Sequence, residues 1–243
     1  TKILHHAVNV LIINITYRKY MVIKAIATDI DGTITNNRRE ITVEVIYAFR
    51  KLEKKNIKVI LVSGNVLPVT MGFRIFLGTS GPLISENGGI VLNDKIYKYF
   101  DKKDIEDAFL NFKKIYPKAE RILTDRWRET SITLVPETDL KIAKEFFSNL
   151  NYNVQATGFG IHIMHKEQNK LFGLKKISEM ISIDLDEIMA FGDSENDVEM
   201  IKNAGIGIAV SNAWNIVKEN ADYITRKKYG HGVIEALKKY KIL

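Results

Sequence analysis

The sequence predicts an α/β protein with a parallel-sheet core into which a smaller α+β domain is inserted. Up to about residue 100, and again from residue 166, short apolar runs of strand length alternate with helical patterns of apolar residues. Such alternation is typical of a parallel sheet. Between the two stretches, residues 101–165 show an α-β-β-α-β-β pattern, which suits a small antiparallel sheet with helices on one face.

Size and composition agree with a soluble globular protein. The 243 residues are 46% hydrophobic and 27% charged, enough for a substantial core. Disulfides and cysteine-based metal sites are excluded because the sequence contains no cysteine. No apolar run reaches the length of a membrane span, and no signal peptide is evident. We therefore expect a cytoplasmic protein without a membrane partner.

The net charge is positive. The 36 basic and 29 acidic residues give +7, but the lysines are spread over many segments. A scattered surplus is typical of a solvated surface, so no nucleic-acid partner is expected. The remote alternative is a basic nucleic-acid-binding protein on an enzyme scaffold.

Residues 1–20 are interpreted as an N-terminal extension, with alternating apolar residues that favour an added edge strand. The core is expected from residue 21 to residue 100. A helix between two buried strands implies that the strands are parallel, which makes this core Rossmann-like. The expected elements are a strand from Val22, a helix over 42–56, a strand over 57–62, a helix over 66–77, a strand over 82–85 and a hairpin over 90–100.

The insert is expected to span residues 101–165 and to duplicate one layout. Its elements are a helix from Asp101 to Tyr116, strands over 121–124 and 130–135, a helix over 138–150, and strands over 153–156 and 160–165. The core resumes over residues 166–243 with a helix that starts at Lys170 and a buried strand that ends near Phe191.

The first strand leads into Asp29-Ile30-Asp31-Gly32-Thr33. A bare Asp-Gly pair usually marks a hairpin turn. Here the four fixed positions of D-x-D-G-T occur together at the end of a buried strand, which favours a functional site.

Polar groups also follow two other strands. Ser63 follows the second strand, and Asp193 and Asp197 follow the strand that ends near Phe191. Ligands of an open parallel sheet bind beyond the carboxyl ends of its strands. Carboxylates that converge there repel one another and need a cation, and all-oxygen ligation suits Mg²⁺.

This set of groups describes a site for phosphoryl transfer. Asp29 is the candidate nucleophile, which forms an aspartyl-phosphate, and Asp31 is the candidate proton donor and acceptor. Asp193 holds the metal, with Asp197 beside it either directly or through water. The expected phosphate-binding groups are Ser63, Gly64, Asn65 and Lys170.

Each group also has a simpler interpretation. Ser63 could be a helix N-cap, and Lys170 could be a surface lysine. The segment from Asp193 to Asp197 could be a calcium loop, although the later acidic residue of that motif is missing.

The four motifs Asp29-x-Asp31-Gly32-Thr33, Ser63-Gly64-Asn65, Lys170 and Gly192-Asp193-x3-Asp197 resemble, in order, those of the haloacid dehalogenase (HAD) superfamily. The insert resembles the C2 cap of Cof-like phosphatases, and its small size is similar to archaeal phosphoglycolate phosphatases. The resemblance implies a magnesium-dependent phosphatase with metal contacts from Asp29, Asp31 (through its backbone carbonyl), Asp193 and Asp197. The family commonly has Thr where this chain has Ser63, and the hydroxyl is kept.

Substrate choice is expected to come from the insert. Arg126 and Arg128 are candidates for clamping a substrate carboxylate, and His162 and His165 lie on its last strand. The resemblance makes 2-phosphoglycolate the expected substrate. A sugar phosphate and mannosyl-3-phosphoglycerate are the alternatives, and a homodimer is compatible with the sequence.

Overall fold

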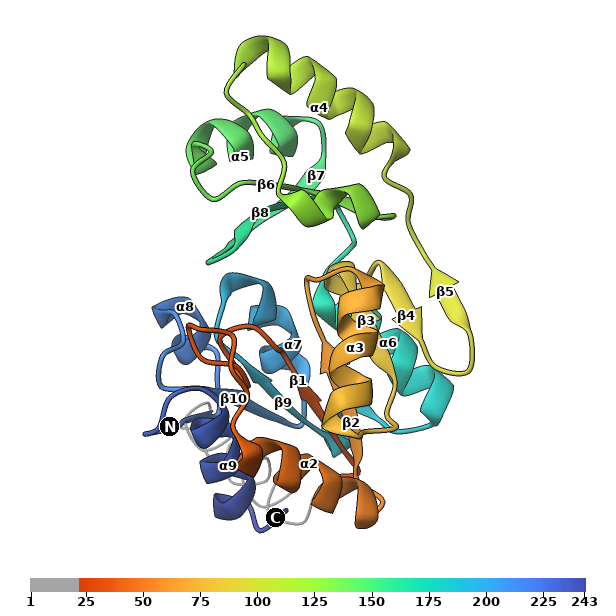
Figure 1. Ribbon diagram of the computed structural model, residues 1–243, viewed down its shortest axis with the longest axis vertical. Coiled ribbons are helices and arrows are strands. Elements are labelled where there is room, and N and C mark those ends of the chain that lie inside the picture. The colour runs from red at the N-terminus through yellow and green to blue at the C-terminus, as the bar shows by residue number, and fades with distance from the viewer. Residues whose placement is uncertain (1–21) are drawn as a thin grey trace, which may run out of the picture.

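The computed structural model describes residues 22–243, so the expected extension over residues 1–20 lies outside the described part (Figure 1). The chain forms an α/β core with an eight-stranded sheet and a second unit with a three-stranded sheet above it. The predicted fold class is confirmed: a parallel-sheet core carries an α+β insert. None of the helices within residues 22–243 is long and apolar enough to cross a membrane.

The centre of the large sheet is β1 (Ala25–Thr28), which pairs in parallel with β2 (Lys58–Val62) and β9 (Ile188–Gly192). The full strand order is β11-β10-β9-β1-β2-β3-β4-β5. Strands β3 to β5 form an antiparallel extension of the sheet. The remaining strands are β3 (Leu83–Ser85), β4 (Ile90–Leu92), β5 (Ile96–Lys98), β10 (Ile206–Ala209) and β11 (Tyr223–Ile224).

Both faces of this sheet are covered, so its central strands are apolar on both sides. Ile26 packs into the cluster that contains Phe49 of α2 (Val43–Lys54), and Ala27 packs into the cluster that contains Leu174 of α6 (Lys170–Ile181). The first face is also covered by α3 (Leu67–Leu77), α8 (Asn215–Glu219) and α9 (Tyr229–Lys239), and the second by α7 (Val198–Asn203). Burial on both faces explains why β1 and β9 are continuous apolar runs.

The insert has its own core. Its sheet has the order β6-β8-β7 and is antiparallel, and α4 (Lys103–Ile115) and α5 (Leu140–Asn149) lie on the face away from the large sheet (Figure 1). Phe112 and Phe147 of the two helices pack against Ile132 and Ile163 of the sheet. The strands are β6 (Ser131–Leu134), β7 (Tyr152–Thr157) and β8 (Gly160–His165).

The strand expected over Arg121–Thr124 is wrong. Arg121 forms only an isolated bridge to Leu134, and Leu123–Trp127 forms a 3-10 helix, η2. The buried carboxylate of Asp125 accepts a hydrogen bond from the backbone N–H of Thr133 at 2.6 Å. A side chain therefore satisfies an N–H group of β6 that a neighbouring strand would have paired, and the insert is α-β-α-β-β.

Candidate active site

The register of the central strands brings three strand ends to one edge of the sheet. Thr28 is level with Leu61 on one side and with Phe191 on the other. Asp29 therefore lies beside the last residues of β2 and β9, next to the loops that carry Ser63 and Asp193. This is the convergence that the sequence predicts.

Three buried carboxylates meet at this edge. Asp29, Asp193 and Asp197 each offer one oxygen atom, and these atoms all lie within 4.8 Å of one another. Oδ2 of Asp29 is buried and has no hydrogen-bond partner among the described residues. An all-oxygen set with an unpartnered buried carboxylate oxygen fits a divalent metal ion.

Lys170 lies at the first turn of α6 and its side chain is buried beside this cluster. Its Nζ donates to Oδ1 of Asp29 and to Oδ1 of Asp197, both at 2.6 Å. Asn169 N-caps α6 by accepting a hydrogen bond from the N–H of Phe172. The prediction that Lys170 belongs to the site rather than to the surface is consistent with this burial.

Burial dominates the electrostatics of the cluster. It raises the pKa of Asp193 to about 7, and the neighbouring charge of Asp197 adds to this effect. It also raises the pKa of Asp29 well above its ordinary value, against the opposing effect of Lys170. Burial alone would lower the pKa of Lys170, but Asp197 and Asp29 outweigh it and raise that pKa above its ordinary value. A cation among these carboxylates would lower the pKa of both Asp29 and Asp193.

The loop after β1 fits closely against the loop after β9. Gly32 has a φ of +85°, and a Cβ atom there would lie 2.5 Å from Oδ2 of Asp193. Thr33 and Ser194 donate their hydroxyls to Asp193 at 3.0 and 3.1 Å. Glycine at position 32 therefore allows the backbone to approach the carboxylate that the two hydroxyls orient.

Asp31 lies beside Asp29 but outside the carboxylate cluster. It is partly exposed, and its Oδ2 accepts a hydrogen bond from Nδ2 of Asn65 at 2.5 Å. The hydroxyl of Ser63 is buried and accepts from the N–H of Asn65 at 3.0 Å. Ser63 is not the N-cap of α3, because that position is occupied by Val66.

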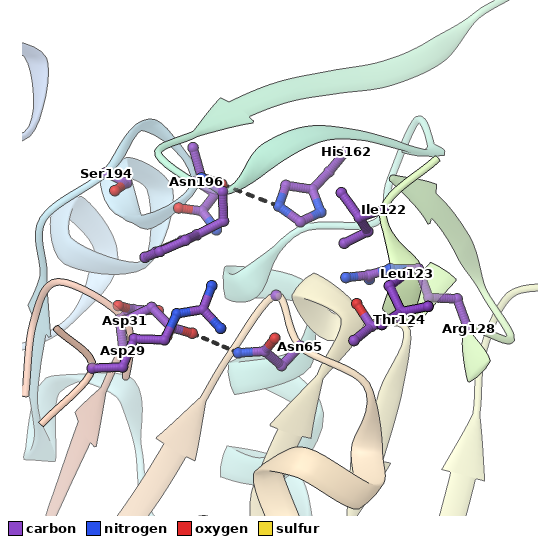
Figure 2. A pocket seen from close by; sticks show the side chains of 14 residues that line it. Asp29, Asp31, Asn65, Ile122, Leu123, Thr124, Arg128, His162, Ser194 and Asn196 are labelled. Carbon is purple, nitrogen blue, oxygen red and sulfur yellow. Dashed lines mark hydrogen bonds between the residues drawn. The ribbon is translucent and has the colours of Figure 1, made fainter. Parts of the chain in front are cut away.

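A cavity of about 250 Å³ lies between the core and the insert. Figure 2 shows Asp29 and Asp31 on one side of it, and Thr124 and Arg128 on the other. Of the predicted site residues, Asp29, Asp31, Gly64, Asn65 and Arg128 line the cavity. The others, Ser63, Lys170, Asp193 and Asp197, are buried next to it but are not part of its lining.

The structure separates the candidates of the insert. Arg128 is buried and lines the cavity, whereas Arg126 is exposed and lies over the ring of Trp127. His162 is buried and lines the cavity as well, whereas His165 is exposed and stacks on Phe100. The two histidines differ because side chains alternate along β8, whose even-numbered residues face the large α/β core.

The insert also contacts the core at two points near the cavity. Lys144 of α5 forms an ion pair with Glu195 at 3.1 Å, in the loop between Asp193 and Asp197. The guanidinium of Arg39 lies 4.5 Å from the ring centre of Phe159. The loop with two of the three clustered carboxylates thus touches the insert directly.

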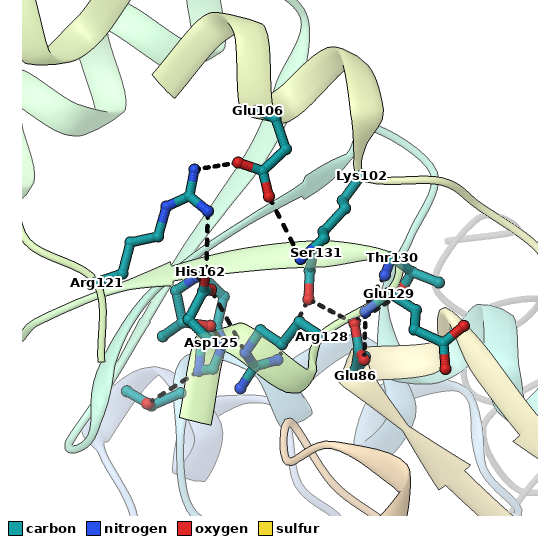
Figure 3. Close-up of polar contacts among 12 residues, drawn as sticks. Glu86, Lys102, Glu106, Arg121, Asp125, Arg128, Glu129, Thr130, Ser131 and His162 are labelled. Atoms are coloured by element: carbon teal, nitrogen blue, oxygen red, sulfur yellow. Dashed lines mark hydrogen bonds and ion pairs between the residues drawn. The ribbon is translucent and has the colours of Figure 1, made fainter. Parts of the chain in front are cut away.

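Sequence reasoning missed Glu86 and Asn87, which lie between the strand expected over 82–85 and the hairpin expected over 90–100. The buried carboxylate of Glu86 accepts hydrogen bonds from the backbone N–H groups of Glu129 and Thr130, each at 2.9 Å (Figure 3). Asn87 accepts a hydrogen bond from Nδ2 of Asn196 at 2.9 Å. Positive φ angles at both Glu86 and Asn87 were not visible in the pattern, although Glu-Asn-Gly-Gly signals a tight turn.

The family model for haloacid dehalogenase-like hydrolases matches residues 26–120 and 102–237 of this chain. The chain belongs to the haloacid dehalogenase-like hydrolase family. The family resemblance inferred from the four motifs is thereby confirmed.

Several relatives of this chain are named phosphoglycolate phosphatase. A protein of Methanothermobacter thermautotrophicus named phosphoglycolate phosphatase is 37% identical over 218 residues, which cover 89% of this chain and 98% of its own length. A phosphoglycolate phosphatase of Picrophilus torridus is 37% identical over 223 residues, which cover 91% of this chain and 93% of its own.

Solved structures share the fold. A crystal structure of a Thermoplasma acidophilum protein superposes with a TM-score of 0.83 at 30% identity, covering 91% of this chain and all of that one (100%). A haloacid dehalogenase-like hydrolase from B. subtilis superposes with a TM-score of 0.78 at 21% identity, covering 89% of this chain and 99% of that one. At that identity the second match supports the fold alone.

Proposed function

We propose that this protein is a magnesium-dependent phosphatase that hydrolyses a small phosphomonoester, with 2-phosphoglycolate as the first choice. The observation that carries the proposal is the cluster of Asp29, Asp193 and Asp197, with Lys170 bound to two of them and an unpartnered oxygen on Asp29. The names of the relatives over most of the chain favour 2-phosphoglycolate as substrate.

Asp29 and Asp193 would hold Mg²⁺ through their side chains, Asp31 through its backbone carbonyl, and Asp197 either directly or through water. When bound, the ion would neutralise the clustered carboxylates and the charge that develops on the transferring phosphoryl group. Lys170 would add a fixed positive charge at Oδ1 of Asp29.

Asp29 acts as the nucleophile. Its carboxylate attacks phosphorus in line with the leaving oxygen, so that a bond forms between aspartate oxygen and phosphorus as the ester bond breaks. Asp31 gives a proton to the leaving oxygen and releases an alcohol, which is glycolate for the first-choice substrate. Asp31 then takes a proton from water, which attacks the aspartyl-phosphate, releases inorganic phosphate and restores Asp29.

The phosphate would be bound by the turn after β2. The hydroxyl of Ser63 and the N–H groups of Gly64 and Asn65 lie where β2 passes into a turn before α3, and N–H groups at such a turn attract anions. The N–H of Asn65 donates to the Ser63 hydroxyl at 3.0 Å, so it would have to turn from that hydroxyl to the phosphate. The side chain of Asn65 already bonds Asp31, so it ties the phosphate-binding turn to the proton-transfer group.

We also propose a division of labour between two domains. Residues 21–100 and 166–243 would form the hydrolase core, and residues 101–165 would form a C2-type cap that closes over the substrate. The cavity is lined by residues of both the core and the insert. Seven of them belong to the insert: Ile122, Leu123, Thr124, Arg128, Thr157, Phe159 and His162. Closure by such a cap excludes water and selects the leaving group.

A phosphatase screen tests the proposal. Purified protein is incubated with a panel of small phosphorylated metabolites, with Mg²⁺ and with EDTA, and phosphate release is measured. We expect Mg²⁺-dependent release that is fastest with 2-phosphoglycolate. Faster turnover of a sugar phosphate or of mannosyl-3-phosphoglycerate would replace the substrate, whereas no release with any ester would overturn the activity.

A further inference from the structure

Arg128 is a buried cation at the catalytic cavity, and no carboxylate of the described residues lies within hydrogen-bond distance of it. Its side chain is about 1% exposed, and the nearest carboxylate oxygen among residues 22–243 is Oδ1 of Asp125, 3.9 Å from its Nε. That Nε has no hydrogen-bond partner in the described part of the chain. A buried guanidinium with five donors is costly unless charged or polar groups meet it.

Both carboxylate oxygens of Asp125 accept hydrogen bonds from groups other than Arg128. Its Oδ1 accepts from the N–H of Thr133 at 2.6 Å, and its Oδ2 accepts from Nη1 of Arg121 at 3.2 Å. Arg121 therefore holds the closer ion pair with this carboxylate. Glu86 also offsets the charge of Arg128, which reaches it through the hydroxyl of Ser131. Neither carboxylate lies within hydrogen-bond distance of the guanidinium, so an anion in the cavity could bind it directly.

The position of Arg128 is fixed by the core rather than by the insert alone. Its Nη1 donates to the hydroxyl of Ser131 at 3.2 Å, and that hydroxyl donates to Oε2 of Glu86 at 3.0 Å (Figure 3). Glu86 also holds the backbone of the next two residues, Glu129 and Thr130. A carboxylate of the core thus anchors the segment that carries Arg128, so the guanidinium has a defined place relative to Asp29.

The cavity places Arg128 across from the candidate nucleophile. Asp29 and Asp31 line one side, and Arg128 and Thr124 line the other (Figure 2). His162, which also lines the cavity, has a pKa well below its ordinary value because it is buried and because Arg128 and Lys170 lie nearby. The histidine is therefore neutral at pH 7, and Arg128 is the buried positive group that the insert presents to the cavity.

We propose that Arg128 binds a carboxylate of the substrate, so that the protein selects small phosphomonoesters that carry an acid group. This inference rests on the proposed phosphatase function and deepens it. The planar fork of a guanidinium matches a carboxylate through two parallel hydrogen bonds. Arg128 lies on the side of the cavity opposite Asp29 and Asp31, so the acid group would lie at the end of the substrate away from the phosphate.

The test compares two esters with the same two-carbon skeleton in Arg128→Gln and Arg126→Gln. One ester is 2-phosphoglycolate and the other is 2-hydroxyethyl phosphate, which has an alcohol in place of the carboxylate. Arg126→Gln is the matched control, because it removes the same charge two residues away at an exposed site. Arg128→Lys, which keeps the charge, is made in parallel in case the Gln variant does not fold.

For Arg128→Gln we expect kcat/KM on 2-phosphoglycolate to fall about 10- to 100-fold, the range of a lost charge-assisted hydrogen bond. We expect kcat/KM on 2-hydroxyethyl phosphate to change less than about 3-fold, and Arg126→Gln to change neither value. Arg128→Lys should lose part of the acid preference. An equal fall on both esters, or no fall on either, in Arg128→Gln or Arg128→Lys would overturn the inference.

A binding measurement separates this inference from the proposed activity. Calorimetry with Mg²⁺ is carried out on Asp29→Asn with and without Arg128→Gln, with each ester as titrant. Weaker binding of 2-phosphoglycolate alone in the double variant supports the carboxylate site even if the wild type hydrolyses neither ester. Equal affinity of the two variants for 2-phosphoglycolate overturns the site even if the wild type is an active phosphatase.

Discussion

Nζ of Lys170 lies 2.6 Å from Oδ1 of Asp29, although the two residues are 141 positions apart in the chain. Both side chains are buried, and Lys170 makes a second bond of the same length to Asp197. One cation thus holds together the carboxylate that follows β1 and one that follows β9. The structure of the site in the absence of metal depends on this lysine.

Removing Lys170 should therefore destabilise the metal-free protein. We expect Lys170→Met to lower the free energy of unfolding in EDTA by about 3–5 kcal/mol, because two buried carboxylates lose their partner. Urea unfolding measures this. Lys175→Met, at an exposed position of the same helix, should change stability by less than about 0.5 kcal/mol. Equal stability of the two variants would show that Lys170 does not compensate the cluster.

Asp193 should be required for metal binding. A ligand that binds only the folded state raises the melting temperature, so Mg²⁺ should stabilise the wild type. We expect this rise to be largely lost in Asp193→Asn. Glu195→Gln removes a charge from the same loop, outside the carboxylate cluster, and should keep the rise. Melting curves with and without Mg²⁺ decide the point, and the same rise in both variants would contradict the assignment.

Gly32 should be required for the close approach of the two loops. Alanine at this position would have a φ of +85° and a Cβ atom 2.5 Å from Asp193. We expect Gly32→Ala to cost more than about 1 kcal/mol of stability and to weaken Mg²⁺ binding. Gly158→Ala, where a Cβ atom meets nothing within 4 Å, is the control. Matching Mg²⁺ titrations of the two variants would argue against this account of the loop.

His162 should make the protein less stable in mild acid. Burial, with Arg128 and Lys170 nearby, lowers the pKa of His162 well below 6.5 in the folded state. The unfolded chain then binds the proton more readily, so stability falls as the pH falls below 6.5, by up to about 1.4 kcal/mol per pH unit. His162→Gln removes this contribution. Urea unfolding between pH 7 and pH 5 should show that the wild type loses stability relative to the variant, and parallel curves would contradict the prediction.

The sequence predicted the positions of those candidate site residues that directly follow buried strands. The sequence placed Asp29 and Asp193 after buried strands of a parallel sheet, and the structure pairs these strands in parallel and brings both carboxylates to one edge. The sequence predicted a strand over Arg121–Thr124, whereas the structure has a 3-10 helix over Leu123–Trp127. This difference was not predictable, because it depends on a hydrogen bond between the Asp125 side chain and Thr133.

The sequence could not separate Arg126 from Arg128 for the same reason. The segment that carries Arg128 is held by Glu86, which lies 43 to 45 positions before the three residues that follow Arg128. No local pattern records such a contact. The bonds of Glu86 join the core to the insert, so they follow only from the three-dimensional arrangement of the two units.

The most direct test of the account is the covalent intermediate on Asp29. The protein is mixed with 2-phosphoglycolate and Mg²⁺, quenched in acid within one turnover, digested and analysed by mass spectrometry. The account predicts one phosphoryl group on the peptide that contains Asp29, and neither adduct nor phosphate release with Asp29→Asn. Undiminished phosphate release by Asp29→Asn, or a phosphoryl group on any other residue, would contradict it.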